Sequence, residues 1–235
     1  NGEIVYVEND ELKSLKPFSP KKIRPCVFEY IYFSRPDSIL NGITAYEYRK
    51  NLGAQLAKED NLDADVVVPV PDSGNAAAFG YAQQKNITFD LGLIRNHYVG
   101  RTFIEPTQKI RSLGVKLKLN ANLSVIKNKK IILIDDSLVR GTTSYKIVKM
   151  LYDAGAKEVH VRIASPEIKY PDFYGVDMPT KKELLAANKS VNEICKFISA
   201  RSLKYLSING LYKALGFEKR NNTYPQLTDH YFTGE

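Results

Sequence analysis

The chain has 235 residues, of which 43% are hydrophobic and 26% are charged, and its formal net charge is +8. This length fits one large α/β domain or one domain with an appendage, and the hydrophobic content excludes a disordered chain. The positive charge would permit nucleic-acid binding, but the lysines are scattered and form no long basic tract. A mildly basic surface around an anionic small molecule explains the charge about as well, so we expect no nucleic-acid partner.

The two cysteines, Cys26 and Cys195, lie far apart in the sequence. They do not indicate a disulfide framework, so we expect a reducing compartment and a cytoplasmic location. No apolar run approaches the ~18 residues of a membrane span and no signal peptide is visible, so we expect no membrane partner. Because the chain begins at Asn1 rather than at a methionine, we expect it to be a piece of a longer protein.

The first predicted elements are a strand, a turn and a helix. Residues 65–70 (DVVVPV) are the short, continuous, β-branched run that is typical of a buried strand. Pro71–Gly74 has turn chemistry, and the small residues of 75–82 predict a helix that packs closely on a sheet. Residues 89–94 (FDLGLI) are a second strand candidate. The hydrophobic residues of 95–122 follow neither the helical nor the strand period, which predicts a long loop or a mobile segment.

The same alternation continues further along the chain. Residues 130–134 predict a third strand, and residues 158–165 (EVHVRIAS) predict a fourth. Between them, Thr142 or Thr143 can cap a helix that ends at Gly155 in a left-handed conformation. The apolar face of this helix carries Ile147, Val148 and Leu151.

Three further features are expected to be structural rather than functional. The aromatic residues of 28–33 (FEYIYF) alternate as in a strand. His160 alternates within its predicted strand, and Cys195 lies in a helical stretch, 190–200, as a small buried hydrophobe. The aromatic side chains that we assign to the core are Tyr30, Tyr32 and Phe33.

The alternation of strands and helices predicts an α/β fold with a mostly parallel central sheet and helices on both faces. In such sheets, ligands bind outside the carboxyl ends of the strands. Three informative loops are expected there: Pro71–Asn75, Asp135–Thr143 and the segment after Ile94. Their convergence indicates a ligand site more strongly than any one motif does.

Residues 131–144 (IILIDDSLVRGTTS) carry the chemistry of that predicted site. Asp135 and Asp136 end a strand, where their side chains are expected to be exposed and to accept hydrogen bonds from the two hydroxyls of a sugar diol. The loop 137–143 adds backbone amides, hydroxyls and a helix start, which together suit a phosphate. A ribose 5-phosphate combines both groups. The alternative is an ordinary strand–turn–helix connection with aspartates used as turn and cap residues.

This stretch resembles the signature of type I phosphoribosyltransferases, which bind 5-phosphoribosyl-1-pyrophosphate (PRPP). The form IDDSLVRGTTS is similar to that of the amidophosphoribosyltransferase family. The other stretches that agree cover most of the chain: FEYIYFSRPDS (28–38), VPVPDSG (68–74), NHYVGRTFIEP (96–106) and DFYGVDMPTKKELLAA (172–187). The resemblance implies the type I phosphoribosyltransferase fold, with a flexible lid loop at 96–112.

The resemblance also implies roles for individual residues. Asp135 and Asp136 correspond to the acids that hold the ribose hydroxyls with a metal ion close by, and Ser73 corresponds to a magnesium contact. In the lid, Tyr98, Arg101 and Lys109 become candidates for contacts with substrate or nucleotide, whereas His97 departs from the expected arginine. The remaining binding residues that the resemblance implies are Asp72 and Gly74 near the pyrophosphate, and Ser137, Val139, Arg140, Gly141, Thr142 and Thr143 around the 5-phosphate.

The cofactor that the resemblance implies is Mg²⁺. Some family members carry an iron–sulfur cluster on four cysteines. Here Cys26 stands near one ligand position, Asp172 replaces a second, and the C-terminal pair is absent, with His230 in that region. Two cysteines cannot hold a four-cysteine cluster, so we expect none.

The implied activity is the synthesis of 5-phosphoribosylamine and pyrophosphate from PRPP and ammonia, the first step of purine biosynthesis. The implied partners are inhibitory purine nucleotides, further copies of the chain in a homo-oligomer, and a glutaminase domain that is missing from this chain. We therefore expect a linker over residues 1–27, a phosphoribosyltransferase domain over 28–216 and a C-terminal extension over 217–235. The alternatives are a PRPP-binding regulator that senses purines, or a phosphoribosyltransferase that acts on a free base.

Overall fold

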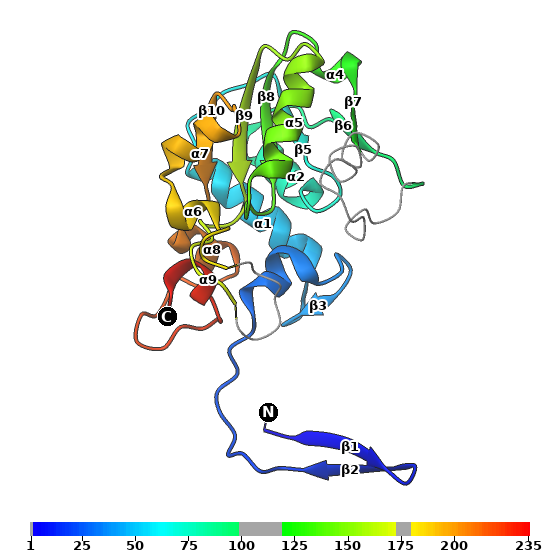
Figure 1. Cartoon of the computed structure of the whole chain (residues 1–235), viewed down its shortest axis with the longest axis vertical. Coiled ribbons are helices and arrows are strands. Elements are labelled where there is room, and N and C mark those ends of the chain that lie inside the picture. The colour runs from blue at the N-terminus through cyan, green and yellow to red at the C-terminus, as the bar shows by residue number, and fades with distance from the viewer. Residues whose placement is uncertain (1, 99–118, 173–179) are drawn as a thin grey trace.

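A four-stranded parallel sheet forms the centre of the molecule in the computed structural model, which describes residues 2–98, 119–172 and 180–235. The strand order is β10 (Ser202–Tyr205), β9 (Glu158–Ile163), β8 (Lys130–Asp135) and β5 (Val66–Pro69). All three pairings are parallel, and Figure 1 shows β8 and β9 running side by side through the middle of the domain. The predicted parallel sheet is confirmed, but β10 was not foreseen.

Alternating side chains of β8 contribute to two hydrophobic clusters, one on each face of the sheet. Ile132 and Ile134 pack in the cluster that contains α1 (Ala45–Lys58), α2 (Asn75–Lys85) and α8 (Ile208–Ala214). Ile131 and Leu133 pack in the cluster that contains α5 (Thr142–Asp153) and α7 (Val191–Phe197). Both faces of this strand are therefore buried, which explains its continuous aliphatic sequence.

Local sequence signals set the ends of these helices. The Thr44 hydroxyl caps α1 by accepting a hydrogen bond from the Glu47 amide at 3.3 Å, and Ser190 and Glu193 form a reciprocal capping box on α7. Gly155, with φ of 89°, follows the end of α5 as predicted. The predicted threonine cap of α5 is wrong, because Gly141 occupies the cap position and Thr142 is the first helical residue.

Helices α1 and α2 cross at a close contact that two glycines permit. A Cβ atom on Gly53 would lie 1.8 Å from the Ala77 carbonyl oxygen, and one on Gly80 would lie 1.9 Å from the Lys50 carbonyl oxygen. Because both neighbours are backbone atoms within helices, no rotamer change could relieve either clash. The crossing brings the start of α2, which follows the Pro71–Gly74 loop, firmly against α1.

Smaller elements surround this core. One prediction is wrong, because Glu29–Phe33 form the short π-helical turn η1 and not a strand. Residues 89–94 are a strand only in part: Phe89 makes an isolated parallel bridge to Val67 of β5, and Leu93 and Ile94 belong to β6, which pairs with β7 outside the central sheet. Tyr30 is buried as expected, but Tyr32 and Phe33 are about half exposed. The elements are β1 (Ile4–Glu8), β2 (Glu11–Leu15), η1 (Glu29–Phe33), β3 (Ile39–Leu40), β4 (Ile43–Thr44), β6 (Leu93–Arg95), β7 (Leu119–Ala121), α4 (Leu123–Ile126), α6 (Leu185–Asn188) and α9 (His230–Thr233).

The N-terminal hairpin β1–β2 stands apart from the rest of the molecule, joined to it by an extended segment (Figure 1). The opposite end of the chain is built into the domain. Cys26 and Thr228 form a parallel bridge, and the Val27 amide donates to the Thr228 carbonyl at 3.1 Å. Tyr231 and Phe232 are buried in the same cluster as Phe28.

A buried charged network connects α1, α2 and β9. Asp60 accepts hydrogen bonds from the Arg162 guanidinium and, at 2.6 Å, from the Tyr81 hydroxyl. Burial alone would raise the pKa of Asp60, but the hydrogen bonds and charge supplied by Arg162 and Tyr81 outweigh it, so the pKa lies below its ordinary value. His160 is also buried, and it bonds Ser202 and Glu158, which confirms its structural role.

Among the residues that the structure describes, no helix is both long and apolar enough to cross a membrane.

Replacing Gly53 or Gly80 with alanine should lower the free energy of unfolding by at least about 2 kcal/mol. The displaced backbone outweighs the gain in helix propensity of about 1 kcal/mol. Asn51→Ala, at an exposed position of α1, is the control and should change stability by less than about 0.5 kcal/mol. Chemical denaturation measures both effects. A Gly53→Ala variant as stable as the parent would contradict the close crossing.

Asp60→Asn should lower the free energy of unfolding by about 3–5 kcal/mol at neutral pH, because it leaves the Arg162 charge buried without its partner. The folded-state pKa of Asp60 is depressed, so its contribution is present above the unfolded value of ~3.9 and is lost as pH falls below it. The difference between parent and variant should therefore be constant above about pH 5 and shrink in acid. Urea titrations at several pH values test this, and a difference that grew in acid would contradict it.

Candidate functional site

The carboxyl ends of β5 and β8 lie side by side and place two predicted loops together. The register pairs Val66 with Ile131 and Pro69 with Ile134. One residue further on, the Val70 amide donates to the Ile134 carbonyl oxygen at 2.8 Å. The chain after Val70 therefore begins at the same edge of the sheet as the Asp135–Asp136 pair, as the sequence predicted.

Gly74 allows the Pro71–Gly74 loop to pack against the end of β8. Its amide donates to the Val70 carbonyl at 2.9 Å, which folds the loop back on itself. A Cβ atom at this position would lie 2.6 Å from the Ile134 carbonyl oxygen and 2.8 Å from that of Val70. The side chain of Asp72 remains half exposed, and α2 begins directly afterwards at Asn75.

The acid pair differs from the prediction in one respect. Asp135 is partly exposed, but Asp136 is buried, with 7% of its surface accessible. Successive side chains at the strand end point in different directions, so Asp136 turns into the protein when Asp135 faces outward. The Asp136 amide donates to the Asp135 carboxylate at 3.0 Å, and the Ser137 hydroxyl donates to the Asp136 carboxylate at 2.5 Å.

Two neighbouring carboxylates in a confined space disfavour negative charge. Burial raises the pKa of Asp135 well above its ordinary value, and the adjacent charge of Asp136 adds to the shift. Burial also raises the pKa of Asp136, opposed by hydrogen bonds from Ser137 and Ser73 and by the charge of Arg49. The pair is therefore suited to a ligand that supplies hydrogen-bond donors or positive charge.

Arg49 is a component of the site that the sequence analysis missed. Its side chain is 5% exposed, and it donates to the carbonyl oxygens of Tyr30 at 3.1 Å and Ser34 at 2.6 Å. Burial lowers the pKa of Arg49, and the negative charges of Asp136 and Glu29 oppose that shift. Arg49 thus connects η1 to the acid pair. The sequence feature that could have indicated this role is a single arginine among the residues that form the buried face of α1.

The 137–143 loop leads from the acid pair into α5. Leu138 is buried and anchors the loop in the core, whereas Arg140 is exposed and pairs with Glu183, Nε to Oε1, at 3.3 Å. Gly141 has φ of 71°, which glycine tolerates without strain. The predicted binding residues Thr142 and Thr143 are exposed on the first turn of α5.

The N-terminus of α5 can hold an anion. Its first backbone amides have no partner within the helix, and the helix dipole places partial positive charge there. Val139 does not offer its carbonyl to this space, since that group accepts from the Leu185 amide at 2.9 Å. The loop therefore presents amides, two exposed hydroxyls and Arg140 at one end of the acid pair.

Arg95 is a second residue that the prediction missed. It lies at the end of β6 and forms an ion pair with Asp72, which places the Arg95 side chain against the Pro71–Gly74 loop. Tyr98 is fully exposed. The other predicted lid residues, Arg101 and Lys109, lie outside the described part of the chain.

The residues at the positions where some family members have iron–sulfur ligands contact their own neighbours instead. Cys26 Sγ lies 3.2 Å from the Tyr231 hydroxyl, and His230 Nε2 lies 2.9 Å from Asp172 Oδ1. Cys195 is far along the chain and donates to the Ala200 carbonyl. Within residues 2–98, 119–172 and 180–235, no three His, Cys, Asp or Glu side chains form a group that could hold a metal ion by themselves.

Comparison with known proteins gives concordant matches. The chain is 56% identical over 241 residues to the amidophosphoribosyltransferase of Rhizobium etli, an alignment that covers 100% of the chain and 49% of the relative. It is 51% identical over 216 residues to that of Bacillus subtilis, covering 92% of the chain and 45% of the relative. No protein-family model matches.

A solved structure extends the match to three dimensions. The glutamine PRPP amidotransferase of B. subtilis, complexed with ADP and GMP, superposes with a TM-score of 0.84 at 48% sequence identity. The superposition covers 100% of this chain and 51% of that one. Together with the sheet order and the loops at its carboxyl edge, this match defines a type I phosphoribosyltransferase fold.

Within that class, the chain belongs to the amidophosphoribosyltransferase family. It spans about half the length of the curated relatives that it matches.

Replacing Arg49 with methionine should lower the free energy of unfolding by about 2–4 kcal/mol. Two carbonyl groups lose their donor, and the Asp136 carboxylate loses its nearby positive charge. Arg35→Met is the matched control: Arg35 is an exposed arginine paired with Asp37, so its loss should cost less than about 1 kcal/mol. Thermal and urea unfolding compare them. Equal effects of the two substitutions would refute the role assigned to Arg49.

Proposed function

We propose that this chain binds PRPP and transfers its phosphoribosyl group to ammonia, yielding 5-phosphoribosylamine and pyrophosphate. This is the reaction that opens purine synthesis. The observation that carries the proposal is the convergence of the Asp135–Thr143 and Pro71–Gly74 loops at one edge of the sheet. High identity to amidophosphoribosyltransferases over the whole chain supports the choice of reaction.

The acid pair is proposed to hold the ribose. Two adjacent hydroxyls of a ribose are hydrogen-bond donors, and the neighbouring carboxylates of Asp135 and Asp136 are acceptors. Burial raises the pKa of both acids, so their ionised forms are unfavourable in the site without a ligand. The ribose hydroxyls would stabilise these two negative charges by donating hydrogen bonds to them. Arg49, behind Asp136, keeps that carboxylate charged and in place.

The two loops are proposed to hold the phosphates. The amides at the start of α5 and the hydroxyls of Thr142 and Thr143 would bind the 5-phosphate, with Arg140 as a nearby cation. The pyrophosphate would lie near Asp72, Ser73 and Gly74. Arg95 reaches this loop through its ion pair with Asp72 and could reorient toward the leaving group.

The donor set at the site fits Mg²⁺. Asp135, Asp136 and Ser73 supply oxygen atoms, and Mg²⁺ is usually held by one or two carboxylates together with waters and substrate phosphates. When bound, the ion would neutralise charge on the pyrophosphate as it leaves.

The reaction needs no covalent intermediate with the protein. As the bond between C1 of the ribose and the pyrophosphate oxygen breaks, the nitrogen lone pair of ammonia forms the new bond to C1, and the nitrogen then loses a proton. The sugar passes through a cationic, oxocarbenium-like state. The residues act by orienting the ribose through its diol and its 5-phosphate, which fixes C1 relative to both nucleophile and leaving group.

We propose that the remaining half of the full-length protein is a glutaminase that supplies the ammonia. The relatives are about twice as long as this chain. The hairpin β1–β2 exposes Val7 and Leu12 at 69% and 74% of their surfaces, as expected of a segment that packs on another part of a protein. Purine nucleotides are proposed as further ligands, because the B. subtilis relative was solved with ADP and GMP.

Asp135→Asn and Asp136→Asn should each reduce pyrophosphate release at least about ten-fold, because each removes a charge-assisted contact worth about 1.5–3 kcal/mol. Asp153→Asn, at an exposed aspartate on the last turn of α5, is the matched control and should retain activity. Circular dichroism checks that the variants are folded. Near-normal activity in the double variant would exclude the proposed ribose contact.

The activity itself is tested by measuring PRPP-dependent pyrophosphate release by the purified chain. We expect release with ammonium salts, increasing toward the pKa of ammonium because only neutral ammonia attacks, and none with glutamine. Release with free purine or pyrimidine bases but not with ammonia would identify a base phosphoribosyltransferase. PRPP binding without any turnover would favour a purine-sensing regulator.

A further inference from the structure

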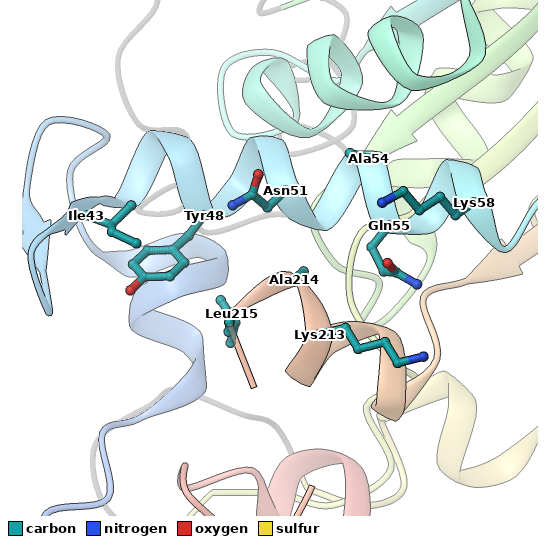
Figure 2. A pocket seen from close by; sticks show the side chains of 10 residues that line it. Ile43, Tyr48, Asn51, Ala54, Gln55, Lys58, Lys213, Ala214 and Leu215 are labelled. Carbon is teal, nitrogen blue, oxygen red and sulfur yellow. The ribbon is translucent and has the colours of Figure 1, made fainter. Parts of the chain in front are cut away.

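A pocket of about 230 Å³ lies between α1 and the C-terminal end of α8 (Figure 2). It shares no residue with the Asp135–Thr143 or Pro71–Gly74 loops, and the proposed reaction makes no use of it. The lining comes from β4, from one face of α1, and from the end of α8 with the turn that follows it. The lining residues are Ile43, Tyr48, Asn51, Ala54, Gln55, Lys58, Lys213, Ala214, Leu215 and Gly216.

The pocket has an apolar end and a cationic end. Figure 2 shows Ile43 and the Tyr48 ring at one end, with Leu215 facing them. At the other end lie the amine-bearing side chains of Lys58 and Lys213. A ligand that fills this space must therefore combine an apolar body with a negatively charged group.

The lining contains two lysines and no carboxylate. Within the described part of the chain, the side-chain amines of Lys58 and Lys213, which are both exposed, make no hydrogen bond or ion pair. The nearest acid in the sequence, Glu59, accepts from the Ser207 hydroxyl, the Ser207 amide and the Gln55 amide group. The Glu59 carboxylate is thus held by neighbours other than the two lysines, and no carboxylate lines the pocket beside them.

Neutralisation of helix dipoles is the other explanation for these lysines. Lys58 and Lys213 lie in the last turns of α1 and α8, where cations are favoured. Lys196 has the same position in α7 and does not line this pocket. Dipole compensation accounts for one lysine on each helix, but not for both of them lining the same end of one amphipathic cavity.

We propose that this pocket binds a small phosphomonoester whose apolar or aromatic body lies against Tyr48 and Leu215 and whose phosphate lies between Lys58 and Lys213. A phosphate dianion matches two ammonium groups that have no acidic partner. The volume lies below the ~300–1,000 Å³ of pockets for drug-sized ligands, which limits the body to one small ring or a short chain.

Phenyl phosphate is a suitable probe for this pocket. Its binding can be followed by NMR of the full chain with ¹³C-methylated lysines and a ¹⁵N-labelled backbone, which measures the chemical shifts of the pocket residues themselves. Saturable shifts are expected for Lys58 and Lys213 and for the amides of Leu215 and Gly216. Phenol, which lacks the phosphate, should leave these signals unchanged at the same concentration. Because the readout is local, binding of the probe to the α5 loop does not affect the interpretation.

Lys58→Ala and Lys213→Ala should each weaken binding at the pocket about five-fold. Lys196→Ala is the matched helix-end control and should leave the affinity within about two-fold. All three side chains are exposed, so unchanged thermal unfolding is expected and confirms that each variant is folded. The proposal is overturned if the pocket signals shift no more than those of Lys196, or if both pocket variants bind as the parent does.

Discussion

The backbone hydrogen bond from the Val70 amide to the Ile134 carbonyl holds the two halves of the candidate site together. It is the last rung of the β5–β8 ladder, and both loops leave the sheet immediately after it. Gly74 then folds back onto the same two strands, so closely that no side chain would fit. The positions of the two loops and of the acid pair all depend on this register, because a slip by one residue would turn Asp135 and Asp136 to opposite sides.

The site carries an electrostatic cost that the surrounding fold offsets. Two adjacent carboxylates, one of them buried, are held by Ser137, by Ser73 and by the charge of Arg49. The Arg49 guanidinium is in turn held by the carbonyl groups of Tyr30 in η1 and of Ser34, which follows η1. Such local conflicts between burial and charge are expected where function, rather than stability, selects the residues. The stable part of the domain, with its two apolar clusters and the Asp60–Arg162 pair, supports this strained edge.

The parallel sheet and the site loops could be predicted because they depend on local sequence. Continuous aliphatic runs mark strands buried on both faces, and the small-residue loops after them need no tertiary information to be recognised. The wrong predictions concern segments whose structure is determined by tertiary packing rather than by local sequence. The FEYIYF segment has strand-like alternation, but it forms a helical turn in which the Tyr30 carbonyl accepts a hydrogen bond from Arg49 and Tyr32 is left exposed. β10 has only half-buried residues at a sheet edge and therefore no clear periodic signal.

The same distinction applies to the site residues. The strand before the acid pair and the loop after it indicated the pair in the sequence. They could not indicate that Asp136 is buried, because that depends on which side of the sheet edge is covered by other elements. Arg49 and Arg95 reach the site from α1 and β6, and pairings across such distances along the chain leave no local pattern. The pocket between α1 and α8 also leaves no local pattern, because Lys58 and Lys213 are far apart in the sequence and line the same cavity only in the folded chain.

A crystal structure of this chain with PRPP and Mg²⁺ would show directly which residues hold the sugar and its phosphate. We expect the ribose hydroxyls within hydrogen-bond distance of the Asp135 and Asp136 carboxylates, and the 5-phosphate on the backbone amides of residues 137–143. A ribose diol that contacts neither aspartate, with the 5-phosphate bound away from the start of α5, would contradict it.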